Sequence, residues 1–141
     1  MIRRGNYNAD RFRTQRDTKR IALSTFTVEL PVPPSTNNLF ATNSKTGRRF
    51  PSKEYDAWRK EAAQMLMAQR ARVAIGPVAI TITVQEGRGD IDNRIKAVID
   101  CLVLNGIIDG DTSKTVRSVT ARWGDVVGAL VEIAPAQARA A

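Results

Sequence analysis

Two aspartates separated by one residue, Asp90 and Asp92, have the spacing in this 141-residue chain that most clearly indicates chemistry. They stand where an extended segment is expected to enter a helix, and residues i and i+2 of an extended segment point to the same side. Carboxylates that face one point repel each other unless a cation lies between them. Asp111 is the expected third acid, and Lys96 would lie near the same edge, one helical turn beyond Asp92.

A set of oxygen ligands favours Mg²⁺, and we expect Mn²⁺ to be able to replace it. Such a metal activates water and offsets the charge of a phosphate, and a nearby lysine stabilises charge that develops in the transition state. The chain has no histidine and one cysteine, Cys101, which excludes Ser-His-Asp and Cys-His catalysis and a structural zinc cluster. Cys101 stands in an apolar helical stretch, so a buried thiol is expected. The pattern favours phosphodiester hydrolysis without a small-molecule cofactor.

Each acid also has a structural interpretation. Asp92 is a suitable helix N-cap, and Asp109 and Asp111 are typical turn residues around Gly110. The Asp-Gly-Asp turn resembles part of a calcium loop, but no glutamate follows at the distance that an EF-hand requires. A DNA-binding module without catalysis and a calcium-binding structural protein therefore stay open as alternatives.

The elements that must position these residues follow from hydrophobic periodicity and from turn residues. The order strand, helix, strand, helix, strand, strand predicts one α/β (α+β) domain with a mixed sheet packed against two main helices. Gly124-Asp125 is expected to join the last two strands as a hairpin. The expected segments are a strand at 25–30, a turn at 35–38, a basic loop at 41–49, a helix after Ser52, a strand at 78–84, a helix from Asp92 to Asn105–Gly106, and strands at 115–123 and 127–133.

Positive charge is concentrated before this domain. The chain has 22 Lys and Arg against 14 Asp and Glu, a net charge of +8, and residues 1–23 hold seven basic and two acidic residues, or +5. We expect a disordered basic arm at 1–23, a folded domain at 24–133 and a disordered tail at 134–141. The chain shows no signal peptide and no apolar run long enough to span a membrane, so we expect a cytoplasmic protein without a membrane partner.

Two stretches resemble the RusA-type endodeoxyribonucleases, the Holliday junction resolvases of bacteria and their prophages. The first is residues 30–38, Leu-Pro-Val-Pro-Pro-Ser-Thr-Asn-Asn. The second is residues 90–96, Asp-Ile-Asp-Asn-Arg-Ile-Lys, which is followed by Asp100, Leu102, Gly106, Ile107 and Asp111. The resemblance extends over about Phe26 to Ile133. Where the family often has two adjacent acids, Gly110 here separates Asp109 from Asp111, and the spacing from Gly106 favours Asp111.

The resemblance implies that Asp90, Asp92 and Asp111 bind Mg²⁺ and that Lys96 is the catalytic lysine. It also implies a homodimer that makes paired cuts in opposed strands of a four-way junction, during recombination, repair or phage DNA processing. A nuclease for flaps or other branched DNA stays open as a further alternative. DNA phosphates are expected to meet Lys45, Arg48, Arg49, Arg88 and Arg94.

Overall fold

The structure is a computed structural model that describes residues 24–136. The predicted arm at 1–23 and residues 137–141 of the predicted tail lie outside the described residues. The elements are β1 (Phe26–Leu30), the 3-10 helix η1 (Thr36–Asn38), β2 (Phe40–Thr42), β3 (Arg49–Pro51), α2 (Lys53–Ala68), β4 (Val78–Gln85), the 3-10 helix η2 (Ile91–Arg94), α3 (Ile95–Leu104), β5 (Val116–Gly124) and β6 (Ala129–Pro135).

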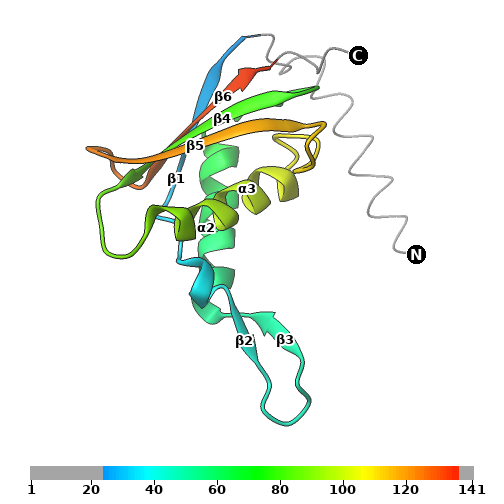
Figure 1. Ribbon diagram of the computed structural model, residues 1–141, viewed down its shortest axis with the longest axis vertical. Coiled ribbons are helices and arrows are strands. Elements are labelled where there is room, and N and C mark those ends of the chain that lie inside the picture. The colour runs from blue at the N-terminus through cyan, green and yellow to red at the C-terminus, as the bar shows by residue number, and fades with distance from the viewer. Residues whose placement is uncertain (1–23, 137–141) are drawn as a thin grey trace.

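Four strands form one mixed sheet in the order β1-β6-β4-β5, with both helices on one of its faces (Figure 1). β4 pairs with β5 in parallel and with β6 in antiparallel orientation, while β1 pairs with β6 in antiparallel orientation. The predicted mixed α/β fold with two helices is therefore confirmed. Alternate residues of β4 are buried, as expected for a strand with helices against one face. They join the buried residues of β6 and the helices in one core.

The helices begin and end for local reasons. Ser52 has an extended backbone, and its hydroxyl accepts a hydrogen bond from the Tyr55 backbone amide at 3.0 Å, so Ser52 is the N-cap of α2 and the helix expected after it is confirmed. Gly106 follows α3 with a φ of 71°, the left-handed conformation expected there. No helix within residues 24–136 combines the length and the hydropathy needed to cross a membrane.

The predicted hairpin of the last two strands is wrong, because β4 lies between β5 and β6. β4 is the central strand, and its backbone groups are paired on both edges, with β5 on one side and β6 on the other. Gln85, at the end of β4, fixes the segment that connects β5 to β6. Its backbone amide donates to the Gly128 carbonyl at 2.8 Å, and its side-chain oxygen accepts from the Gly128 backbone amide at 2.9 Å. Gly128 has a φ of 75° and lies against the carbonyl of Leu30, so a side chain there has no room.

Two boundaries also differ from the prediction. The basic loop expected at 41–49 is the tip of a small hairpin, because β2 and β3 pair on either side of it. This hairpin projects away from the main sheet (Figure 1). β6 continues through Ala134 and Pro135, which pair with Ala79 and Val78 of β4, so the strand is longer than the predicted limit at residue 133.

Candidate active site

Asp90 and Asp92 lie just past the carboxyl end of β4, at the entrance to η2 and α3. Asp90 has an extended backbone, with φ −92° and ψ 143°, and Asp92 belongs to the first turn of η2. Both side chains are exposed. The prediction that the helix starts with Asp92 as its N-cap is wrong, because a 3-10 turn comes first and α3 begins at Ile95. Within residues 24–136, neither carboxylate caps a helix or forms an ion pair.

Arg94 fixes the backbone around these acids. Its guanidinium donates one hydrogen bond to the carbonyl of Pro33 at 2.7 Å and another to the carbonyl of Arg88 at 2.8 Å. The Thr36 hydroxyl donates to the carbonyl of Asn93 at 2.9 Å. These bonds bring together two stretches that are about 60 residues apart in the chain, the proline-rich turn after β1 and the aspartate turn. The turn that holds Asp90 and Asp92 is thereby fastened to the proline-rich stretch, and its own loop is closed by the bond to the Arg88 carbonyl.

Lys96 projects from the first turn of α3 and forms an ion pair with Asp100, with 3.2 Å between the ammonium and a carboxylate oxygen. The lysine side chain is about half exposed, so this pairing is weak. Burial raises the pKa of Tyr55 on α2, and the negative charge of Asp100 raises it further. Asp100 therefore lies close enough to influence both Lys96 and Tyr55. The sequence resemblance pointed to Asp100, which follows the aspartate motif. Its influence on Tyr55 could not be predicted in the same way, because it depends on the packing of α2 against α3.

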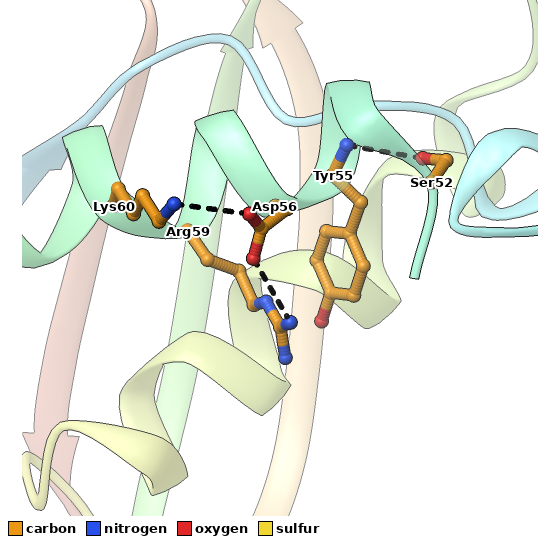
Figure 2. Close-up of polar contacts among 5 residues, drawn as sticks. All are labelled: Ser52, Tyr55, Asp56, Arg59 and Lys60. Carbon is orange, nitrogen blue, oxygen red and sulfur yellow. Dashed lines mark hydrogen bonds and ion pairs between the residues drawn. The ribbon is translucent and has the colours of Figure 1, made fainter. Parts of the chain in front are cut away.

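The first half of α2 has its own polar cluster (Figure 2). Asp56 pairs with Lys60 at 3.1 Å and with Arg59 at 3.5 Å, and its pKa is lowered mainly by the hydrogen bond from Lys60. The Arg59 guanidinium lies 4.7 Å from the centre of the Tyr55 ring. Figure 2 shows Tyr55 and Arg59 extending from the same side of α2. This arrangement holds the Tyr55 ring in place beside α3.

Asp111 lies at the other end of α3. The helix has 10 residues, or about 15 Å of rise, and Asp111 precedes the amino end of β5 while Asp90 follows the carboxyl end of β4. Since β4 and β5 are parallel, these are opposite ends of the sheet, as Figure 1 also shows. Within the described residues no three acidic or cysteine side chains gather closely enough to hold a metal ion. A single chain therefore carries two of the three predicted acids on one turn, and the third lies at the other end of the sheet.

Asp109, the other acid of that turn, has a structural contact. Its carboxylate accepts a hydrogen bond from the Gly76 amide at 3.3 Å, near the start of β4. The neighbouring Ala74 amide donates to the Ile107 carbonyl at 2.8 Å. These bonds fasten the segment after α3 to the segment before β4. Asp109 thus supports the turn that carries Asp111.

The five predicted DNA-binding residues occupy two places. Lys45, Arg48 and Arg49 are exposed on the projecting hairpin, where the Arg49 guanidinium lies 4.9 Å from the centre of the Phe40 ring. Arg88 is exposed in the loop between β4 and Asp90. Arg94 is half-buried and uses two donors on backbone carbonyls, so its evident role is to position the turn.

Cys101 lies in the core as expected, and two tryptophans pack there with it. Cys101 is buried, and burial raises the pKa of its thiol to about 11, so it is not a nucleophile. Trp58 is buried, with its ring nitrogen donating to the Pro31 carbonyl at 3.1 Å. Trp123 is partly buried and packs against the core.

Comparison with protein families gives a match to the model of endodeoxyribonuclease RusA over residues 31–134, which is most of the chain. Comparison with curated proteins gave no match. The matched region contains the proline-rich turn, the hairpin, both helices, the aspartate turn and Asp111. The chain therefore belongs to the RusA family of Holliday-junction-resolving endodeoxyribonucleases.

Proposed function

We propose that the protein is a Mg²⁺-dependent resolvase that cuts a phosphodiester in each of two opposed strands of a four-way DNA junction. The observation that carries the proposal is the pair of exposed carboxylates, Asp90 and Asp92, on a turn that Arg94 and Thr36 hold in place. This pair stands in a chain of the RusA endodeoxyribonuclease family. The expected setting is recombination, repair or phage DNA processing.

Asp90 and Asp92 offer carboxylate oxygens from one turn, and hard cations such as Mg²⁺ prefer oxygen ligands. Bound there, Mg²⁺ or Mn²⁺ would favour the ionised form of water and offset the charge of the scissile phosphate. Lys96, in the first turn of α3, would stabilise negative charge on that phosphate after leaving Asp100. Its ion pair with Asp100 is exposed enough to exchange at little cost.

A second copy of the chain would supply the third acid. β5 is an edge strand of the sheet, so its outer edge is open to pairing within the described fold. Two β5 strands paired antiparallel about a two-fold axis would place the amino end of one beside the carboxyl end of the other. Asp111 of the second copy would then approach Asp90 and Asp92 of the first. The proposed homodimer therefore accounts for the separation of these acids within one chain.

Mixing two inactive variants tests this assembly. In a dimer of one Asp92→Asn subunit and one Asp111→Asn subunit, shared sites leave one site with both acids intact and put both changes in the other. After random exchange, about a quarter of all sites would be active, so single nicks should reappear on a junction. If each site were built within one chain, every site would carry one change and the mixture would stay inactive.

Phosphate binding is expected from Lys45, Arg48 and Arg49 on the hairpin and from Arg88 beside the aspartate turn. Each phosphate contact adds about one to the slope of log affinity against log salt concentration. Changing Arg48 or Arg88 to Met should therefore weaken binding to all DNA sequences and reduce that slope. A change in sequence preference without a change in slope would contradict the role of these side chains.

Cleavage of a synthetic four-way junction tests the function. The protein and its Asp92→Asn variant are incubated with Mg²⁺ and with a junction, a flap or a linear duplex. We expect paired nicks near the crossover by the parent protein alone, and none on the duplex. Preferred cutting of flaps would support the alternative branched-DNA nuclease. Binding without cutting in any divalent metal would support a non-catalytic DNA-binding module, in which Asp92→Asn keeps or improves affinity.

A further inference from the structure

The β2–β3 hairpin has two aromatic rings on opposite faces. Phe40 pairs with Pro51 and Ala41 with Phe50, so Phe40 and Phe50 project to different sides of the ribbon. The Phe40 ring packs edge-on against Tyr55 of α2 with 5.9 Å between centres, and Arg49 covers it. Phe40 therefore anchors the hairpin to the domain. Phe50 lies on the face turned away from that anchor.

Phe50 is 47% exposed, against 37% for Phe40, so it is the more exposed of the two rings of the hairpin. The hairpin is basic, since no acidic residue occurs between Glu29 and Glu54, and Lys45 and Arg48 lie on it in addition to the Arg49 that covers Phe40. An exposed aromatic ring among cations suits the face of a nucleic acid base beside its phosphates, and it suits an apolar protein surface less well.

The base of the hairpin is tied to the candidate active site. The Ser52 amide donates to the Leu39 carbonyl at 2.9 Å, and the Ser52 hydroxyl donates to the Asn38 carbonyl at 2.6 Å. These bonds join the hairpin to η1. Thr36 of η1 then donates to the Asn93 carbonyl, next to Asp92. The hairpin, η1 and η2 thus share one hydrogen-bonded base, and the position of Phe50 is coupled to that of the two aspartates.

We propose that Phe50 is a positioning residue that stacks on a base at the branch point of the DNA and holds the crossover open while Asp90 and Asp92 engage the phosphate. Duplex ends that meet at a junction have bases with a free face, and an apolar wedge against such a face stabilises the unstacked form. The inference rests on the proposed function. It differs from phosphate binding because the ring carries no charge and acts on DNA structure.

The test uses a four-way junction that carries the fluorescent base 2-aminopurine beside the crossover, because its emission rises when the base leaves its stack. Every protein also carries Asp92→Asn, so that the DNA stays intact. Phe50→Ala removes the ring, Phe50→Trp keeps an aromatic face, and Val127→Ala is the matched control. Val127 is 93% exposed in the connection between β5 and β6, away from the hairpin. Thermal melting of each variant checks that it is folded.

We expect saturating protein to raise the emission and Phe50→Ala to lose most of that rise. Phe50→Ala should also bind the junction about fivefold or more weakly, as loss of one stacked base implies. Phe50→Trp and Val127→Ala should behave like the parent. The proposed stacking of Phe50 would be overturned if Phe50→Ala raised the emission as much as the parent does, or if the parent gave no rise.

Sedimentation of Phe50→Ala supplies a second check. A parent dimer that becomes a monomer on this change would overturn the proposal, because the ring would then be a subunit contact. The outcomes also separate the wedge from the proposed function. If the Asp92-intact protein does not cut junctions, the function fails, whereas cutting without the emission change refutes the wedge alone.

Discussion

Replacing Arg94 tests whether this arginine supports the aspartate turn or contacts DNA. Its guanidinium bonds to the Pro33 carbonyl in a half-buried setting and to the Arg88 carbonyl in an exposed one. A hydrogen bond from a charged donor contributes about 1.5–3 kcal/mol, and the exposed bond contributes less because water replaces it. Arg94→Met should therefore lower the free energy of unfolding by about 2 kcal/mol. For a domain of this size that corresponds to a fall in melting temperature of roughly 8 °C.

The assay is urea denaturation of Arg94→Met, Arg94→Lys and the control Arg88→Met. Arg94→Lys keeps the charge but cannot span both carbonyls, so we expect about half of the loss. The Arg88 side chain is exposed, so Arg88→Met should change stability by less than about 0.5 kcal/mol. Because Arg94 supports the turn of Asp90 and Asp92, Arg94→Lys should also slow cleavage while leaving the salt dependence of DNA binding unchanged. An Arg94→Met variant as stable as the parent, with a reduced salt slope, would refute this reasoning and indicate a phosphate contact.

Two further predictions concern the fold. Gly128→Ala should lower stability by well over the roughly 1–2 kcal/mol cost of a left-handed alanine, because its side chain would meet the Leu30 carbonyl. Gly47→Ala, with a φ of 71° and open space, should cost only that amount in the same urea titration, and equal losses would contradict the packing argument. The folded pKa of Cys101 is raised from 9.0 to about 11, so its contribution to stability is complete below pH 9 and is lost as pH rises to 11. The free energy of unfolding should therefore fall by about 2–3 kcal/mol between pH 9 and pH 11, and it should fall less in Cys101→Ala. An equal fall in both proteins would contradict the raised pKa of the thiol.

Much of the fold was predictable because the signals are local. The alternation of β4, the N-cap at Ser52 and the left-handed Gly106 each depend on neighbouring residues, and each is present in the structure. The start of the second helix was misplaced because a 3-10 turn and an α-helix have similar starting sequences. The local pattern therefore placed the two aspartates at the entrance to the second helix, and it was wrong about Asp92 as the cap of that helix.

The pairing of the strands could not be obtained from local signals. Gly124-Asp125 has the composition of a hairpin turn, yet β4 separates the strands on either side and forms backbone hydrogen bonds with both of them. The same pairing determines where Asp111 lies. A parallel β4-α3-β5 unit places the loop after β4 and the loop before β5 at opposite ends of the sheet. The motif spacing led to the prediction that Asp90, Asp92 and Asp111 share one site, whereas one chain places Asp111 at the other end of the sheet.

Cleavage of a supercoiled plasmid that carries an extruded cruciform tests the central claim most directly. Paired cuts across the four-way junction at its base give linear plasmid, whereas unpaired cuts give nicked circles. We predict that the protein with Mg²⁺ yields linear plasmid with cuts placed symmetrically about the crossover, and that Asp92→Asn yields none. Linear product from Asp92→Asn at the rate of the parent would contradict the assignment of the active site.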